Sequence, residues 1–210
     1  MENGFVFLDE MLPGVRWDAK YATWDNFTGK PVDGYEANRI VGTEALALAL
    51  REVRRRAAAL GYDLLLWDAY RPKRAVTCFL RWAERRENGR TKARYYPRID
   101  RAEMITNGYV SPQSSHSRGS AVDLTIYRPD TGDLVPMGGD FDLMDELSHH
   151  GAKGITPSET RNRNLLRSLM ESSGFEAYRF EWWHYVLKNE PFPCRDFDFP
   201  IITSNTPSQL

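Results

Sequence analysis

The chain has 210 residues, of which 41% are hydrophobic and 27% are charged. This composition is typical of a globular protein, and the length suits one domain with a sizeable core. The 28 Lys and Arg residues nearly balance 29 Asp and Glu residues, and this balance disfavours a dedicated nucleic-acid-binding protein. Two cysteines are too few for a disulfide framework.

The sequence contains no pattern of a membrane span or a signal peptide. Its longest apolar run, Ala45 to Leu50, is far shorter than the ~20 residues that a span requires. The first residues lack a basic start followed by an apolar stretch. We therefore expect a cytoplasmic protein without a membrane or nucleic-acid partner. The oligomeric state stays open, and a homo-oligomer is compatible with the sequence.

The first half of the chain predicts loops, then helix, strand and helix. Turn-forming and aromatic residues in the first 40 positions favour short strands and ordered loops. Good helix formers fill residues 43–60 and stop at Gly61, which predicts a helix. The apolar run 62–67 predicts a buried strand. Pro72 suits a first helical turn, so we expect a second helix over residues 72–86.

The middle of the chain predicts a β-hairpin after a long polar segment. Residues 87–112 are turn-rich, with one short helix expected near 100–106. The alternating, β-branched segment 120–127 predicts a strand. A turn at 129–132 makes residues 133–137 its expected hairpin partner.

The last third predicts one helix and one or two strands. A helix is expected over residues 158–173, with Ser158 as its N-cap and Gly174 just beyond its end. The aromatic segment 175–187 favours β-structure. Residues 203–210 are expected to be a disordered polar tail, which leaves 1–202 as the folded domain. These elements describe a mixed α+β protein.

Two of the four histidines stand in segments that suggest a metal site. His116 lies in the run Ser-Ser-His-Ser-Arg-Gly-Ser-Ala-Val-Asp, which ends at Asp123, and His184 lies in Glu-Trp-Trp-His. Two histidines and one carboxylate can supply three zinc ligands and leave a fourth position for water. A closed structural zinc site would more often be dominated by cysteine ligands, and this chain has only two cysteines.

Glu181 precedes His184 by three residues, which would place the two side chains on opposite faces of a regular strand. For both to reach one site, the chain must bend at Trp182 and Trp183, whose large side chains can anchor the bend in the core. Glu181 would then lie beside the metal without being a ligand. That is the place of a general base.

Arg71 follows the predicted strand and precedes Pro72, which biases it towards extended backbone geometry. Its guanidinium is always charged and offers five N–H donors. Pointed at the metal, it would stabilise the oxyanion of a tetrahedral intermediate.

Each of these patterns, taken alone, has a more common structural explanation. A single His or Glu pattern is weak, the tryptophans are core residues by default, and an isolated arginine is usually a surface residue. His149 and His150 are adjacent and diverge on any regular element, so we interpret them as structural or surface residues. Cys78 lies in a helical pattern among apolar neighbours and is expected to be buried and inert. Together, however, the candidate ligands, Glu181 and Arg71 favour a metallohydrolase.

Four segments resemble the VanX-type D-alanyl-D-alanine dipeptidases. They are Tyr21 to Gly29, Ala69 to Pro72, Ser114 to Leu124 and Glu181 to Tyr185. The resemblance runs from about Phe5 to Pro200. It implies the fold shared by the zinc D,D-carboxypeptidases and the Hedgehog signalling domain, an α+β single domain with a central, mostly antiparallel sheet and helices packed around it.

The resemblance also implies a role for each site residue. His116, Asp123 and His184 would bind one zinc ion, Glu181 would be the catalytic base and then the acid, and Arg71 would stabilise the transition state. The dipeptide would contact three further residues, namely Ser114, Tyr21 and Asp142.

The activity implied is hydrolysis of free cytoplasmic D-Ala-D-Ala, so that cell-wall precursors end in D-Ala-D-lactate, which vancomycin binds poorly. One alternative is a D,D-carboxypeptidase that acts on longer peptidoglycan peptides, and the missing signal peptide disfavours it. Another is a catalytically inactive zinc module that binds partners, or a protein in which zinc only stabilises the fold. Such a module could lose Glu181 or Arg71, and this chain keeps both.

Overall fold

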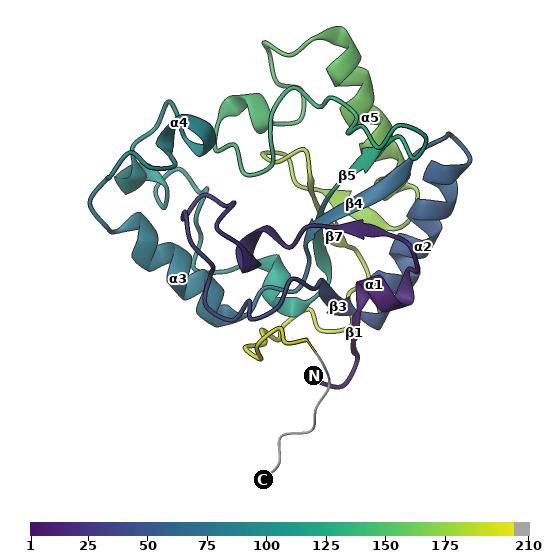
Figure 1. The fold of residues 1–210 in the computed structure, drawn as a ribbon, viewed down its shortest axis with the longest axis horizontal. Helices are drawn as coiled ribbons and strands as arrows, with labels where there is room; N and C mark the ends of the chain where they lie inside the picture. Colours follow the sequence, from purple (N-terminus) through teal and green to yellow (C-terminus); the bar gives the residue numbers. More distant parts are fainter. Residues whose placement is uncertain (204–210) are drawn as a thin grey trace.

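The computed structural model describes residues 1–203, which form a five-stranded sheet with helices on both faces (Figure 1). The strand order is β2-β4-β5-β7-β6, and only the β2–β4 pair is parallel. Strands β1 and β3 form a separate antiparallel pair. The predicted α+β fold with a mostly antiparallel central sheet is confirmed. Of the expected tail, all but Thr203 lies outside the described residues.

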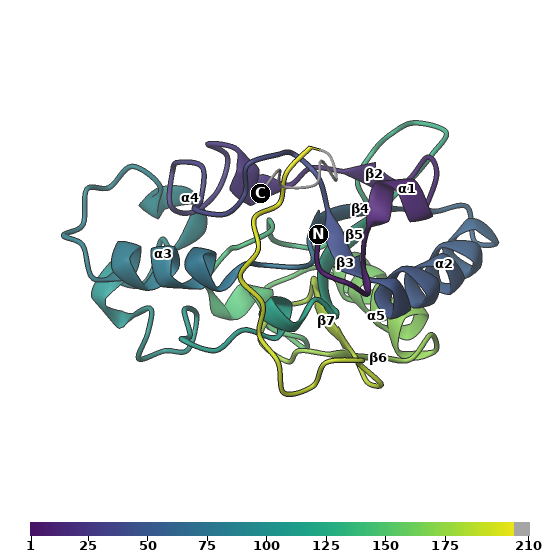
Figure 2. The same cartoon turned by 90° about the horizontal axis from the view of Figure 1, so that it is seen from below.

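The strands are β1 (Phe5–Phe7), β2 (Arg16–Trp17), β3 (Val41–Thr43), β4 (Asp63–Asp68), β5 (Ala121–Tyr127), β6 (Phe175–Ala177) and β7 (His184–Leu187). The helices are α1 (Leu8–Met11), α2 (Glu44–Ala58), α3 (Lys73–Ala83), α4 (Lys92–Tyr95) and α5 (Pro157–Glu171). Figure 2 shows α2 and α5 together on one side of the sheet, with α3 and α4 on the other. No helix within residues 1–203 is long and apolar enough to cross a membrane.

The long helices begin where side chains cap them. The Thr43 hydroxyl accepts a hydrogen bond from the Leu46 N–H at the start of α2. At the start of α5, Thr156 and Glu159 form a capping box, with Pro157 as the first helical residue. The expectation that Ser158 is the N-cap is therefore wrong, because Pro157 already satisfies the geometry of a first helical position.

Three other expectations need correction in detail. The helix expected over 72–86 ends at Ala83. The short helix expected near 100–106 is a single 3₁₀ turn over Arg101–Glu103. The expected hairpin partner of β5 is reduced to one isolated bridge between Tyr127 and Leu134. In the first 40 residues, the expected short strands and loops are joined by the one-turn helix α1.

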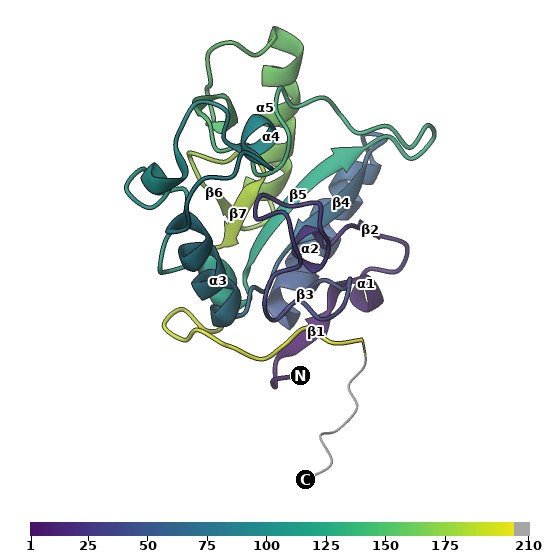
Figure 3. The same ribbon diagram turned by 60° about the vertical axis from the view of Figure 1, so that its left-hand side comes forward.

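The register of the three central strands places three site residues in one row. Asp68 pairs with Asp123, and Asp123 pairs with His184. The first of these pairs exists because the β4–β5 register shifts between Leu66 and Asp68, as at a β-bulge. Since both pairings are antiparallel, the end of β4 meets the early part of β5 and the start of β7 (Figure 3).

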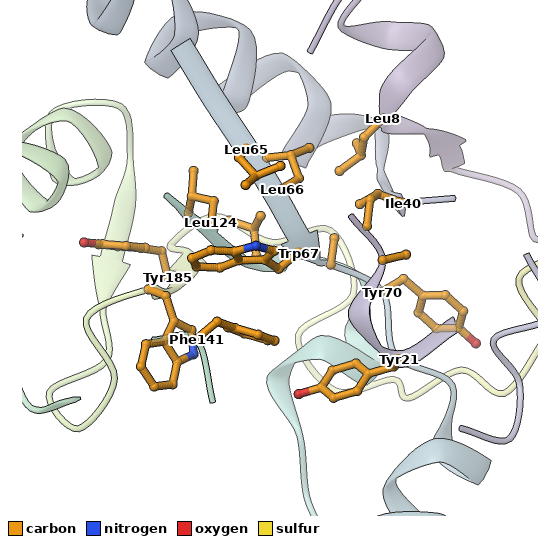
Figure 4. Packing of buried hydrophobic residues seen from close by; sticks show 14 of the residues in the cluster. Leu8, Tyr21, Ile40, Leu65, Leu66, Trp67, Tyr70, Leu124, Phe141 and Tyr185 are labelled. Atoms are coloured by element: carbon orange, nitrogen blue, oxygen red, sulfur yellow. The ribbon is translucent and has the colours of Figure 1, made fainter. Parts of the chain in front are cut away.

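The core beside this row is aromatic. Trp67, the last residue before Asp68, stacks on Phe141 with ring centroids 4.9 Å apart (Figure 4). It also meets the Trp182 ring edge-on at 5.9 Å. Large packed rings of this kind make a stiff support, because any displacement opens a costly void. The site therefore lies on a rigid layer.

A segment near the end of the described chain, residues 192–201, lies across the molecule beside β1 (Figures 2 and 3). We call it the strap. Phe5 of β1 stacks on Phe192 and meets Phe197 and Phe199 edge-on. The Phe197 N–H donates to the Ser117 carbonyl, so the strap contacts the loop that carries His116.

Candidate active site

Three predicted ligand residues converge at the row described above. His116 Nε2 lies 3.0 Å from His184 Nδ1 and 3.3 Å from Asp123 Oδ1, and His184 Nδ1 lies 2.9 Å from the same oxygen. Ligands held ~2.0–2.1 Å from one tetrahedral zinc ion would be separated by about 3.3 Å. The cluster is buried, and its three atoms fit one metal ion.

The second nitrogen of each imidazole has its own partner. His116 Nδ1 lies 2.6 Å from the Ala69 carbonyl, and His184 Nε2 lies 3.1 Å from the Ser115 hydroxyl. A carbonyl can only accept a hydrogen bond, so His116 Nδ1 carries the proton and the lone pair lies on Nε2, facing the cluster. Partners of this kind fix the tautomer and the ring plane of a metal-binding histidine.

The loop that carries His116 depends on a glycine. His116 lies in a 3₁₀ turn, Ser115–Arg118, that ends at Gly119 with a φ of 78°. A Cβ at that position would lie 2.2 Å from the Phe5 ring, so only glycine fits. Gly119 is therefore required where this loop packs against β1.

The protonation states of the cluster favour binding of a cation. Burial tends to raise the pKa of Asp123, but the two histidines outweigh burial and hold the pKa of that carboxyl well below its usual range. Burial lowers the pKa of His116 and favours its neutral form. For His184, burial works in the same direction, but the hydrogen bond that its ring donates to the Asp123 carboxylate raises its pKa.

Glu181 reaches the cluster because the chain turns immediately before β7. Residues 182–183 form a turn, His184 N–H donates to the Glu181 carbonyl, and both tryptophans are buried. The predicted bend is confirmed. The Glu181 carboxylate lies 3.9 Å from His184 Nδ1. Burial is the main cause that raises the pKa of Glu181 to about 7, which suits a group that both accepts and donates a proton.

Arg71 lies between β4 and α3 with its guanidinium turned to the cluster. Its Nη2 is 3.5 Å from Asp123 Oδ2, and its Nε donates to Asp68 Oδ2 at 3.0 Å. The guanidinium lies over the Tyr21 and Phe79 rings, at 5.0 and 5.2 Å from their centroids. The Arg71 side chain is therefore held both by a hydrogen bond to Asp68 and by contact with two aromatic rings.

Tyr21 and Asp142, predicted as substrate contacts, are hydrogen-bonded to each other. The Tyr21 hydroxyl is 2.9 and 3.1 Å from the two Asp142 carboxylate oxygens. Asp142 is the only non-glycine residue within 1–203 with a positive φ, at 60°. Burial and the negative charge of Asp123 raise the pKa of the Asp142 carboxyl well above its usual value.

All the predicted site residues line one cavity of about 380 Å³. They are Tyr21, Arg71, Ser114, His116, Asp123, Asp142, Glu181 and His184. A neighbouring cavity of about 560 Å³ shares part of its wall, namely Gly108, Tyr109, Tyr178 and Glu181. His150 lines neither cavity and His149 lines only the second, so neither histidine joins the cluster.

Sequence reasoning missed three residues that hold the site from behind. Asp68 binds Arg71, Ser115 binds His184, and the Tyr35 hydroxyl donates to Asp68 at 2.8 Å. Asp68 had a signal, because it closes an apolar run three residues before Arg71. Ser115 and Tyr35 had none, since only the fold brings them to their partners.

A buried cluster of two histidines and one aspartate, with an uncommitted glutamate and an arginine on the same cavity, defines the site of a mononuclear metallohydrolase. Comparison with protein families agrees with that class. The family model described as D-Ala-D-Ala dipeptidase, Peptidase M15, matches residues 1–202. The chain belongs to this family.

Three relatives cover the chain over 201 residues, which is 96% of its length and 100% of theirs. Each carries the name D-alanyl-D-alanine dipeptidase. The protein from Enterococcus faecalis is 70% identical, that from Enterococcus faecium 68%, and that from Streptomyces coelicolor 61%.

Proposed function

We propose that this protein is a zinc-dependent dipeptidase that hydrolyses D-Ala-D-Ala to two molecules of D-alanine. The choice of substrate is supported by the three full-length relatives that bear this name. The chemistry is supported by one observation above all others, the convergence of the His-Asp-His cluster, Glu181 and Arg71 on one cavity.

His116, Asp123 and His184 would hold the zinc ion through the three atoms that face one another. Bound there, zinc would lower the pKa of a water molecule towards ~7 and polarise the scissile carbonyl. The Ala69 carbonyl and the Ser115 hydroxyl keep both imidazoles oriented for this task.

Glu181 would act as the base and then as the acid. Its carboxylate lies beside the cluster and accepts no hydrogen bond from the described part of the chain, so it would be free to take a proton from the attacking water. With a pKa of about 7, it can return that proton to the departing amine of the second D-alanine. With that proton, the second D-alanine would leave as a neutral amine when the C–N bond breaks.

Arg71 would stabilise the negative charge that develops on the carbonyl oxygen. Its guanidinium is charged at every relevant pH and is already oriented before substrate binds. Preorganised donors of this kind act strongly where water is excluded.

Asp142, Tyr21 and Ser114 would bind the dipeptide itself. The pKa of Asp142 is raised because its negative charge is buried beside that of Asp123. A substrate ammonium next to Asp142 would restore the ionised form by supplying the missing positive charge. The Tyr21 hydroxyl would hold the carboxylate in place, and Ser114 would contact the dipeptide from the loop before His116.

The test is D-alanine release from D-Ala-D-Ala by the purified protein, with and without a zinc chelator. L-Ala-L-Ala, D-Ala-D-lactate and a peptide ending in D-Ala-D-Ala serve as comparison substrates. Chelator-sensitive cleavage of the free D,D-dipeptide alone, restored by added zinc, supports the proposal. Cleavage of the longer peptide would instead make the protein a D,D-carboxypeptidase. Stoichiometric zinc without any turnover would identify a binding module.

We place the reaction in the cytoplasm, where it would lower the pool of free dipeptide available for cell-wall precursors. Cell fractionation with an antibody to the protein tests the compartment. Sedimentation of the purified protein would show whether it forms a homo-oligomer.

A further inference from the structure

We propose that Tyr35 is a positioning residue for Arg71. It acts through Asp68, and the strap keeps Tyr35 in place. This inference rests on the proposed role of Arg71 as the residue that stabilises the transition state.

Hydrogen bonds fix the main chain of Arg71 on both sides, but they do not fix the orientation of its guanidinium. The Arg71 N–H donates to the His116 carbonyl, and the Ser117 hydroxyl donates to the Arg71 carbonyl. These bonds set where the side chain begins. A long arginine side chain still has several rotatable bonds between that point and the guanidinium.

Asp68 fixes the orientation of the Arg71 guanidinium. One of its oxygens, Oδ2, is 3.0 Å from both Nε and Nη2 of Arg71, which defines the direction of the guanidinium. Among the residues that the structure describes, the only other carboxylate that pairs with Arg71 is that of Asp123, which already binds both histidines of the cluster. Asp68 is almost completely buried and lies outside the cavity wall. It can therefore hold Arg71 without contacting substrate.

Tyr35 fixes the Asp68 carboxylate in turn. Its hydroxyl donates to Oδ1, the oxygen that Arg71 does not use. With Oδ1 held, the carboxylate cannot rotate to offer Arg71 a different geometry. The Tyr35 ring packs 5.5 Å from that of Tyr21, which fixes the hydroxyl from the other side.

The strap holds the backbone around Tyr35. Ile201 N–H donates to the Gly34 carbonyl, and the Glu36 N–H donates to the Ile201 carbonyl. The same strap accepts a hydrogen bond from Lys73, at the start of α3, through the Phe197 carbonyl. One segment thus ties together the loop that carries Tyr35 and the helix that follows Arg71.

The experiment is a double-mutant cycle. Tyr35→Phe removes only the hydroxyl, and it is measured in the wild type and in an Arg71→Ala background. We expect Tyr35→Phe to lower kcat about 10-fold, as expected for loss of a hydrogen bond to a charged group. In the Arg71→Ala background, the further loss should be less than about 2-fold, because the residue through which Tyr35 acts is gone. Zinc content should be unchanged in all variants.

An equal loss in both backgrounds, or no loss in the wild type, would overturn the inference. The same holds if Arg71→Ala itself leaves kcat unchanged, and that result would also refute the proposed role of Arg71.

A readout without substrate separates this inference from the proposed function. The NMR signal of the Arg71 Nε–H, identified by its disappearance in Arg71→Ala, should shift or broaden in Tyr35→Phe. A changed signal in a protein that does not hydrolyse D-Ala-D-Ala would support the positioning role and refute the function. An unchanged signal would overturn the positioning role.

Tyr96→Phe is the matched control. Its hydroxyl is also buried and accepts a hydrogen bond from an arginine, Arg101, but it lines no part of the cavity. This variant should leave both kcat and the Arg71 signal unchanged.

Ile201→Pro tests the strap, because proline lacks the N–H that donates to the Gly34 carbonyl. It should lower kcat in the wild type and have no further effect in Arg71→Ala; additive losses would exclude the strap from the mechanism.

Discussion

The four acidic side chains of the site differ in what binds them. Asp123 is bound by two histidines, Asp68 by Tyr35 and Arg71, and Asp142 by a tyrosine hydroxyl. Within residues 1–203, the Glu181 carboxylate accepts no hydrogen bond, and it lies 3.9 Å from His184 Nδ1. This difference is what the proposed role of Glu181 as the base requires.

The different duties of Glu181 and His184 can be tested by removing each side chain. Glu181→Ala should keep zinc and lose turnover, because the base is not a ligand. His184→Ala should lose zinc itself. Metal content by atomic absorption and D-alanine release measure the two effects. Metal loss from the first variant, or full loading of the second, would contradict the assignment.

Arg71 should be needed as a guanidinium and not only as a positive charge. Arg71→Ala should lower kcat by ~10²–10³-fold, the usual scale for removal of an oxyanion donor. Arg71→Lys should restore only part of the rate, because an ammonium cannot bind Asp68 and the oxyanion with fixed geometry. Steady-state kinetics measure kcat of both variants. A wild-type kcat in Arg71→Lys would show that a positive charge alone is sufficient.

His150 makes stability depend on pH. Burial, supported by the charges of Arg167 and Arg163 on α5, lowers its pKa to about 4. The remaining groups facing it are Glu171 and the Tyr185 ring. In the unfolded chain a histidine titrates near ~6.5, so between about pH 4 and 6.5 the unfolded state binds more protons. Stability from this group is complete above that window and is lost as the pH falls through it.

Replacing His150 by leucine removes its contribution to the pH dependence of stability. The drop in Tm between pH 7 and pH 5 should be smaller in His150→Leu than in the wild type. Thermal unfolding of the metal-free proteins at both pH values measures the difference. An equal drop would mean that His150 titrates normally in the folded protein.

At the scale of elements, the loop that contains Tyr109 forms part of the wall of two neighbouring cavities. Tyr109 and Tyr178 stand between the cavity of about 380 Å³ and its neighbour of about 560 Å³. The loop turns at Gly108, whose φ is 80°, and Tyr109 N–H donates back to the Met104 carbonyl. The wall between the two cavities is thus built by a short, tightly turned segment.

Removing the Tyr109 side chain from this wall should let a longer peptide bind. In Tyr109→Ala the two cavities join, so D-Ala-D-Ala-D-Ala should become a substrate. The measurement is the ratio of kcat/KM for the tripeptide to that for the dipeptide. Tyr62→Ala, a half-buried tyrosine that lines neither cavity, is the control. An unchanged ratio would show that another part of the wall excludes the longer peptide.

Local sequence patterns predict the elements that local forces determine. The helix-forming run before Gly61, the apolar run of β4 and the bend at Trp182 could all be predicted, because propensity, burial and side-chain size act within a few residues. The expected strand over 133–137 is reduced to a bridge at Leu134, a side chain that lies half exposed and so gains little from burial. Asp68 opposite Asp123 could not be predicted, since the register shift depends on the neighbouring strand.

At the scale of the whole molecule, the sheet and the strap support different residues of the site. Three central strands deliver Asp68, Asp123 and His184 in one row, and their positions are as rigid as the sheet. The loop of His116 and the turn of Arg71 lack that support. Two hydrogen bonds compensate for this difference: the strap's Phe197 N–H donates to the Ser117 carbonyl, and the Lys73 N–H donates to the Phe197 carbonyl.

Phe5 and the strap are far apart in the sequence, yet both cover the loop of His116. Ribosomes synthesise the chain from its N-terminus, at ~5–20 residues per second. A nascent chain that still lacks Phe197 cannot close this loop from both sides, however well its sheet has formed. Catalytic activity should therefore appear only after translation of the strap is complete, and the protein cannot act on dipeptide while it is being made.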